Sequence, residues 1–221
     1  MDVNTIYNAN CLEGMKKIPD ESIAAVITDP PYCVGTTSNG HKGTFLDNNL
    51  IVPFFRQFLK EAHRILKPDG EIYIHTDWRT YPFWYLPFNQ RMTMRNLIVW
   101  DYEHMRCGNH YRYSHELILY GTKLRTTKRR FAANERDVWK HKPVHGSRMS
   151  KFHPAQKPLD LTMRMIENST KEGDIVCNPF TGSGTTAVAA IKTKRQYIGF
   201  EIDPAVHAVA TEPIQQAIHQ S

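Results

Sequence analysis

Short apolar runs rich in β-branched and aromatic residues recur along the chain. Runs of this length and composition predict buried β-strands. One example is SIAAVIT at residues 22–28, which ends in the acidic residue Asp29. The predicted strands comprise residues 22–28, 71–77, 96–102, 114–123, 174–180 and 196–203.

Apolar positions between several of these runs recur at helical spacing. Residues 53–67 open on a proline, repeat apolar positions three and four residues apart and stop at Pro68-Asp69-Gly70, which predicts an amphipathic helix with a defined end. Further helices are predicted over 159–171, 185–193 and from Pro204 onward. The alternation of strands and helices predicts an α/β fold in one domain over residues 1–221, with a mostly parallel sheet and helices on both faces.

Parallel sheets of this kind bind ligands beyond the carboxyl ends of their strands. Two polar features fall at such ends, namely Asp29 and the turn TGSGTT at residues 181–186. We therefore expect both on the same edge of the sheet, where they mark a binding site. The loop CVGTTSNGHKGTFLDNN at residues 33–49 has little periodicity and is interpreted as a lid or as an ordinary surface loop.

Gly182 and Gly184 in the turn lack side chains that would keep a bound molecule away from the backbone. The turn has neither the lysine of a P-loop nor the third glycine of GxGxxG, which disfavours an ATPase. Glu201 follows the next predicted strand, where doubly wound folds place an acid against ribose hydroxyls. The alternative is that the glycines only make a tight turn while Glu201 and Asp203 cap the last helix.

The tetrapeptide Asp29-Pro30-Pro31-Tyr32 combines a carboxylate, two rigid residues and an aromatic ring. Each proline fixes φ and lacks an N–H, so the Asp29 carboxylate and the Pro30 carbonyl would form an edge that only accepts hydrogen bonds. Such an edge suits the planar NH₂ group of adenine or cytosine, with Tyr32 stacked on the ring. Hydrogen bonds from both amine protons to these acceptors would favour a pyramidal nitrogen with an exposed, nucleophilic lone pair. The protein would then catalyse the reaction by positioning and electrostatics. The alternative is a strand end that Asp29 merely caps.

The chain has a net charge of +6 and a sequence pI near 9.1, and residues 121–151 hold ten basic residues against two acidic ones. A basic segment in a chain whose remainder is net negative indicates a polyanionic partner such as DNA; a solvated surface is the alternative. The candidate phosphate contacts are Lys123, Arg125, Lys128, Arg129, Arg130, Arg136, Lys140 and Arg148.

The four cysteines are scattered without a CxxC pair, and His104, Cys107 and His110 lack a fourth ligand nearby. This pattern fits neither a disulfide framework nor a zinc site, so no metal is expected. No apolar run reaches the roughly 20 residues needed to cross a bilayer. We expect a soluble protein of the cytoplasm.

The order of these segments resembles that of the amino-methylating DNA methyltransferases that use S-adenosylmethionine, specifically their permuted β group. DPPY at residues 29–32 precedes the basic region, which precedes NPFTGSGTT at residues 178–186. NANCLEGM at residues 8–15, HPAQKP at 153–158 and GFEID at 199–203 are also similar to family segments. The resemblance covers nearly the whole chain and implies the Rossmann-like methyltransferase fold, DNA as partner and the homodimer that the family often forms.

Roles implied by the resemblance can be assigned residue by residue. Asp29, Pro30, Pro31 and Tyr32 would hold the target base. The implied cofactor-binding residues are Asn10, Cys11, Asp29, His153, Gln156, Lys157, Asn178, Phe180, Gly182, Ser183, Gly184, Thr185 and Glu201. Asn10 and Asn178 stand where the family usually has aspartate, which keeps a hydrogen-bonding oxygen but removes a charge.

Within the family, DPPY usually accompanies methylation of adenine N6, so the resemblance implies this reaction on a base flipped out of DNA. Methylation of cytosine N4 is one alternative, and a catalytically silent nucleic-acid-binding module is another. Residues 121–152 would be a short target-recognition insertion, which predicts a short recognition site or relaxed specificity.

Overall fold

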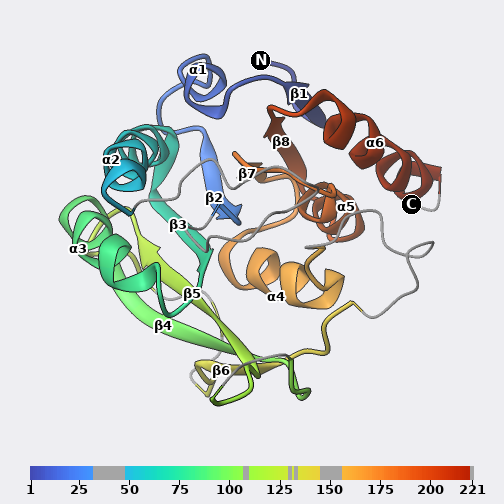
Figure 1. Ribbon diagram of the computed structural model, residues 1–221. Helices are drawn as coiled ribbons and strands as arrows, with labels where there is room; N and C mark the ends of the chain where they lie inside the picture. The colour runs from blue at the N-terminus through green and yellow to red at the C-terminus, as the bar shows by residue number, and fades with distance from the viewer. Residues whose placement is uncertain (32–47, 107–109, 129–130, 132–133, 145–155, 220–221) are drawn as a thin grey trace.

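The protein is described by a computed structural model that covers residues 1–31, 48–106, 110–128, 131, 134–144 and 156–219. An eight-stranded sheet in the order β1-β8-β7-β2-β3-β5-β4-β6 runs through it (Figure 1). The strands are β1 (Thr5–Asn8), β2 (Ile23–Thr28), β3 (Leu66–Thr76), β4 (Thr93–Asp101), β5 (His115–Thr122), β6 (Val138–Lys140), β7 (Ile175–Asn178) and β8 (Gln196–Glu201). All neighbours are parallel except β5, which is antiparallel to β3 and β4. The predicted α/β fold with a mostly parallel sheet is confirmed.

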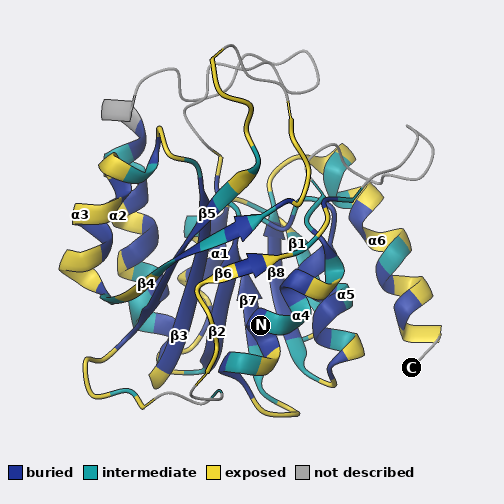
Figure 2. Cartoon of the chain, turned by 90° about the horizontal axis from the view of Figure 1, so that it is seen from below, coloured by how far each residue is buried: buried dark blue, intermediate teal, exposed yellow. Residues whose placement is uncertain are grey.

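Helices cover both faces of this sheet. They are α1 (Cys11–Met15), α2 (Asn48–Ile65), α3 (Tyr81–Arg91), α4 (Leu159–Ser169), α5 (Thr185–Lys192) and α6 (Pro204–His219). Side chains of α1, α2 and α3 share one hydrophobic cluster with the sheet, and those of α4, α5 and α6 share a second. In Figure 2 the central strands β2, β3 and β7 are mostly dark blue, and the helices beside the sheet carry yellow on their outer sides. The alternation within β2 explains the two clusters, because Val26 belongs to the first and Ala25 and Ile27 to the second.

Several elements differ from the expectation based on pattern: β1, α1 and β6 were not predicted, and β3 begins at Leu66 instead of residue 71. Helix α2 begins at Asn48 and contains Pro53, which we expected at its start. Helix α3 was not predicted, because its sequence YPFWYLPFNQR carries two prolines and no clean apolar stripe. Its place depends on packing, since Trp84 is fully buried and stacks on Phe55 of α2 with ring centroids 4.4 Å apart.

Strand direction decides which loops meet. We call the edge at which β2, β3, β7 and β8 end the carboxyl edge, and the opposite one the amino edge. Strand β5 runs the other way, so its first residues lie at the carboxyl edge, where Leu117 pairs with Thr76, and its last residue, Thr122, pairs with Glu71 toward the amino edge. Among the described residues, none of the helices is both long and apolar enough to span a bilayer.

Candidate active site

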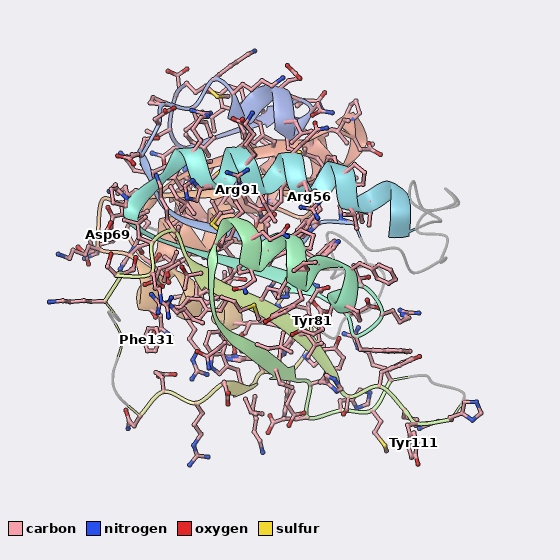
Figure 3. All side chains as sticks on the ribbon, turned by 90° about the vertical axis from the view of Figure 1, so that its left-hand side faces the viewer. Arg56, Asp69, Tyr81, Arg91, Tyr111 and Phe131 are labelled. Carbon is pink, nitrogen blue, oxygen red and sulfur yellow. The ribbon has the colours of Figure 1, made fainter. Side chains whose placement is uncertain are left out.

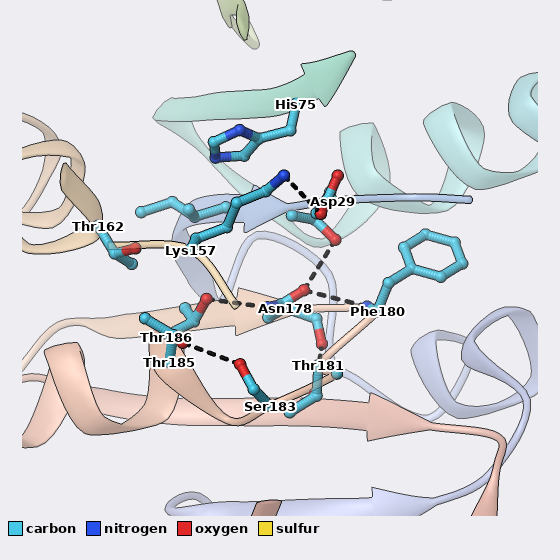
Figure 4. A pocket seen from close by; sticks show the side chains of 13 residues that line it. Asp29, His75, Lys157, Thr162, Asn178, Phe180, Thr181, Ser183, Thr185 and Thr186 are labelled. Atoms are coloured by element: carbon cyan, nitrogen blue, oxygen red, sulfur yellow. Dashed lines mark hydrogen bonds and ion pairs between the residues drawn. The ribbon is translucent and has the colours of Figure 1, made fainter. Parts of the chain in front are cut away.

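A cavity of about 100 Å³ opens at the carboxyl edge, where β2, β3 and β7 end (Figure 4). It is lined by Ile27, Thr28, Asp29, His75, Lys157, Thr162, Asn178, Phe180, Thr181, Gly182, Ser183, Thr185 and Thr186. The two features that the sequence predicted at one edge, Asp29 and the glycine turn, therefore border the same cavity.

The glycine turn connects β7 to α5 through two left-handed glycines. Gly182 has φ of 54° and Gly184 has φ of 80°, conformations that most side chains disfavour. A Cβ on Gly184 would lie 3.0 Å from the carbonyl oxygen of Ala210, whereas one on Gly182 would meet nothing within 4 Å. Gly184 is thus needed for packing as well as conformation, while Gly182 borders open space that a bound molecule can approach.

The side-chain amide of Asn178 holds the start of the turn through hydrogen bonds of both its oxygen and its nitrogen. Its Oδ1 accepts hydrogen bonds from Oγ1 of Thr28 at 2.8 Å and from the backbone N–H of Phe180 at 3.0 Å. Its Nδ2 donates to Oγ1 of Thr186 at 2.8 Å, as the dashed lines in Figure 4 show. Because Asn178 is buried, an amide meets these partners without the free-energy penalty of a buried charge. This accounts for the departure from aspartate.

Glu201 ends β8 and holds the turn from the other side. Its Oε2 accepts the backbone N–H of Gly182 at 2.9 Å, and its Oε1 accepts that of Asp203 at 3.0 Å. A carboxylate offers about four acceptor positions, so Glu201 can also accept hydrogen bonds from two ribose hydroxyls. The open space beside Gly182 and this acceptor fit the nucleoside part of S-adenosylmethionine.

The remaining turn residues pack around the cavity. Phe180 stands edge-on to Phe54 and Phe58 of α2, with ring centroids 5.9 Å and 5.7 Å away. The hydroxyls of Ser183 and Thr185 are 3.0 Å apart and hydrogen-bonded, and both residues are buried. These contacts hold the glycine turn in place on its side of the cavity.

The N-terminal candidates serve the fold with their side chains. Asn10 caps α1 by accepting the N–H of Leu12 at 2.9 Å. Cys11 packs in the core, and burial raises the pKa of its thiol to about 11, so that it is a neutral, apolar side chain. Neither residue is among those that line the cavity.

Asp29 meets Lys157, the lysine of HPAQKP, across the cavity. Nζ of Lys157 lies 2.9 Å from Oδ2 of Asp29 and 2.7 Å from Oε1 of Glu116. Sequence reasoning placed Lys157 near the cofactor but missed Glu116, which lies inside the apolar run of β5. No local signal marks Glu116, because its contact with Lys157 joins residues 41 positions apart.

The two partners stabilise each other's charge against burial. Burial by itself lowers the pKa of Lys157, but the carboxylates of Asp29 and Glu116 outweigh it and raise that pKa above its ordinary value. Burial likewise raises the pKa of Glu116, yet Lys157 and the hydrogen bond from His75 hold it well below the ordinary range. Glu116 and Lys157 are therefore ionised throughout the physiological range.

The other predicted site residues lie beside Asp29 or Lys157, or outside the described residues. Pro30 is buried and Pro31 is exposed directly after Asp29. Gln156 is half-buried beside Lys157, immediately before α4. Tyr32, residues 33–47 of the expected lid, His153, Arg129, Arg130 and Arg148 lie outside the described residues.

The structure does not bring the described part of the basic segment together. The side chain of Lys123 is buried at the amino edge, where it contacts Oε1 of Glu21 at 2.9 Å and the carbonyl of Leu66 at 2.7 Å. Arg125 and Lys128 follow it along the chain, and Lys128 lines the same hollow as Asp69. Arg136 precedes β6, and Lys140, the last residue of β6, pairs with the last residue of β4 at the carboxyl edge. Lys140 therefore lies on the edge of Asp29, whereas Lys123, Arg125 and Lys128 do not.

A different group of basic and aromatic side chains occupies the carboxyl edge. The β4–β5 loop, residues 102–114, carries Arg106 over the ring of Tyr102, with its Cζ 4.3 Å from the ring centroid. Tyr111 in this loop is 91% exposed, and Figure 3 shows it at the opposite end of the molecule from Asp69. A hollow of about 230 Å³ beside the loop is lined by Asp77, Trp78, Arg79, Tyr102, Arg106, Tyr113, His115, Glu116 and Leu117. Glu116 thus borders this hollow while it contacts Lys157.

Known proteins are similar to this chain in sequence and in fold. A family model described as DNA methylase matches residues 23–212. The DNA adenine methyltransferase YhdJ of Escherichia coli (strain K12) is 29% identical over 252 residues, covering 100% of this chain and 85% of YhdJ.

Two solved structures also match. The PvuII DNA methyltransferase (cytosine-N4-specific) has a TM-score of 0.79 at 18% identity, over 98% of this chain and 93% of the other. The M1.HpyAVI–SAM complex has a TM-score of 0.73 at 24% identity, over 95% and 98% respectively. At these identities the structural matches show a common fold.

Proposed function

Because this chain belongs to the DNA methylase family, we propose that it transfers the methyl group of S-adenosylmethionine to N6 of adenine in DNA. The observation that carries the proposal is the shared cavity, which puts the Asp29 carboxylate beside the glycine turn. A methyl donor bound at the glycine turn and a target amine hydrogen-bonded to Asp29 would then lie in the same cavity. YhdJ, which matches the whole chain, is named as an adenine methyltransferase, and this favours adenine over cytosine.

The cofactor supplies an electrophilic methyl group when it is bound. The turn from Phe180 to Gly184 would hold the cofactor, with the open space at Gly182 letting its nucleoside part reach the backbone. Glu201 would accept hydrogen bonds from its ribose hydroxyls while still holding Gly182 and Asp203. These residues bind and orient the donor, and the chemical step depends on the other side of the cavity.

Asp29 and Pro30 would act on the target amine. Its lone pair is delocalised into the base, so it becomes nucleophilic only when the nitrogen is drawn out of the plane. The carboxylate of Asp29 and the carbonyl of Pro30 each accept one of its hydrogens, and Pro30 is buried and so limits movement of that carbonyl. After transfer the surplus proton leaves through Asp29 or water.

DNA must present its base at the carboxyl edge. A base inside a duplex cannot reach the cavity, so it has to be flipped out. The β4–β5 loop lies on that edge and offers guanidinium groups for phosphates and the exposed ring of Tyr111 for stacking. Lys140 lies on the same edge, and the phosphate contacts predicted for Arg129, Arg130 and Arg148 remain part of the proposal.

Removing charge and an aromatic ring from this loop is expected to weaken DNA binding. The double variant Tyr111→Ala/Arg112→Ala should bind duplex DNA roughly 5- to 20-fold more weakly, and the slope of log K against log salt should fall by about 0.9 for one lost phosphate contact. Fluorescence anisotropy at several salt concentrations measures both. The matched control is Arg125→Ala/Lys128→Ala at the amino edge, which should bind like the wild type. An equal loss in both double variants would contradict this docking edge.

Three further parts of the proposal rest on the sequence: the single domain on the chain length, the cytoplasmic location on the scattered cysteines, and the homodimer on the family resemblance. The chain works as one methyltransferase domain, with residues 121–152 contributing to target recognition. It acts in the cytoplasm. It assembles as a homodimer, which analytical ultracentrifugation tests.

The test of the reaction is to incubate the protein with unmodified DNA and methyl-labelled S-adenosylmethionine, digest the DNA and identify the labelled nucleoside. Label in N6-methyladenine supports the proposal, and label in N4-methylcytosine transfers it to the alternative base. No label on duplex or single-stranded DNA, together with measured cofactor binding, would support the silent nucleic-acid-binding module instead.

A further inference from the structure

A chain of charged side chains crosses the carboxyl edge from β2 to β5. These two strands are not neighbours, because β3 lies between them. The Lys157 ammonium spans the gap, 2.9 Å from Asp29 and 2.7 Å from Glu116. The side chains are little exposed, at 25% for Asp29, 15% for Lys157 and 11% for Glu116. The contact between Asp29 and the far strand is therefore partly shielded from water and weakly screened.

Of the three charged side chains Asp29, Lys157 and Glu116, Glu116 is held by contacts with both β3 and the residue after β4. His75 of β3, whose side chain is only 3% exposed, places Nδ1 2.9 Å from Oε1 of Glu116. Tyr102, which follows β4, donates its hydroxyl to Oε2 at 3.2 Å. His75 in turn stands edge-on to Trp100, with ring centroids 6.1 Å apart. Glu116 is thus fixed by one group from β3 and one from the residue that follows β4.

The side-chain torsions of Lys157 and Asp29 do not by themselves fix where their charged groups lie. Lys157 carries its charge on four rotatable carbons, and Asp29 has a broad χ2 torsion at the end of a strand. Nζ of Lys157 also lies 5.7 Å from the centroid of the Trp100 ring, which favours a cation at that place. Fixing the ammonium between Trp100 and Glu116 therefore fixes the carboxylate to which it is bound.

We propose that Glu116 is a positioning residue for the methyl transfer: held by His75 and Tyr102, it anchors Lys157, and Lys157 orients the Asp29 carboxylate toward the target amine. Glu116 acts through Lys157, and we place no contact between Glu116 and the substrate or the cofactor. The inference rests on the proposed function, since it gives the Asp29 carboxylate a task that depends on its orientation. Positioning of a reacting group is worth large factors in rate because small displacements weaken the hydrogen bonds that form in the transition state.

The protonation of Lys157 depends on the charge of Glu116. The groups that face Lys157 and Glu116 are Asp29 from β2, His75 from β3, Tyr102 after β4 and Arg106 over the Tyr102 ring. Removing the charge of Glu116 takes away one of the carboxylates that offset the burial of the Lys157 ammonium. The pKa of Lys157 should then fall.

The test compares Glu116→Gln with Glu71→Gln. Glu71 is a matched control because it is also a buried carboxylate in the sheet, bound by the hydroxyls of Tyr120 at 3.0 Å and Ser169 at 2.5 Å, and it lies toward the amino edge. We expect Glu116→Gln to lower kcat roughly 10- to 100-fold and to leave the Kd of S-adenosylmethionine within about threefold. The alkaline limb of its pH–rate profile should move to lower pH. Glu71→Gln should keep the wild-type kcat and profile.

A second variant and a second measurement keep the outcome decisive. Tyr102→Phe removes only the hydroxyl that binds Glu116 and should lower kcat in the same direction by roughly 3- to 10-fold. The titration of Lys157, followed by nuclear magnetic resonance of labelled lysine side chains, should move to lower pH in Glu116→Gln and stay in place in Glu71→Gln. If Glu116→Gln matches Glu71→Gln in kcat and pH profile, the inference is wrong. If the wild type methylates no DNA, the proposed function fails, and an unchanged Lys157 titration would separately overturn the anchoring of Lys157 by Glu116.

Discussion

Replacing Asp29 with alanine is expected to slow methyl transfer to DNA by roughly 100- to 1000-fold, which is the scale seen when one preorganised hydrogen-bonding group is removed from a transition state. The Asp29 carboxylate lines the cavity and is proposed to accept a hydrogen of the target amine. The glycine turn on the other side of the cavity does not need this carboxylate for its internal hydrogen bonds. The Kd of S-adenosylmethionine should therefore stay within about threefold of the wild type. Labelled methyl incorporation and isothermal titration calorimetry measure the two quantities.

The control for this experiment is Asp69→Ala. Asp69 lies in β3 far from the β4–β5 loop (Figure 3) and is exposed, so its loss should change neither quantity. Asp29→Asn should fall between the wild type and Asp29→Ala, because the amide keeps one acceptor oxygen but not the charge. A rate for Asp29→Ala above a tenth of the wild-type rate would contradict the role given to the carboxylate.

Replacing Lys157 with methionine is expected to lower the free energy of unfolding by about 3–5 kcal/mol, as when one partner of a buried ion pair is removed. The variant keeps the unbranched side chain but leaves Asp29 and Glu116 without their common cation. In the wild type, Lys157 holds the pKa of Glu116 below its unfolded value of 4.5. That contribution to stability is present above pH 4.5 and is lost as the pH falls toward the folded pKa. The difference between wild type and variant should therefore shrink below about pH 4.5.

Lys67→Met is the matched substitution for this prediction. Lys67 also forms an ion pair, 2.7 Å from Asp174, but its side chain is 36% exposed, so its loss should change stability by no more than about 1 kcal/mol. Urea unfolding at pH 7 and pH 4 compares the two variants. Equal stabilities of Lys157→Met and Lys67→Met at pH 7 would show that the Asp29–Lys157–Glu116 contacts contribute little to folding.

Local sequence determined the parts of this protein that depend on local physics. Hydrophobic runs predicted β2, β4, β5, β7 and β8 and the main part of β3, because a buried strand needs apolar side chains in a short continuous stretch. Proline and glycine marked the Asp29 strand end and the Gly182–Gly184 turn, because backbone torsions at these residues are set within a few positions. The rule that parallel strands end at one edge then placed Asp29 and the turn together, and the cavity confirms that placement.

Tertiary structure decided what depends on packing and strand direction. Glu116 and His75 lie in strands whose patterns give no sign of a site, and they meet Lys157 and Asp29 only when β2, β3 and β5 are ordered side by side. The reversed direction of β5 sends Lys123 to the amino edge, although its charge suggested DNA binding. Helix α3 forms because Trp84 and Phe88 are buried against the core. No local sequence pattern predicts this burial. The sequence thus determined the fold class and two halves of the candidate site, and the folded chain decided which distant side chains orient the carboxylate between them, because those contacts depend on strand order and direction.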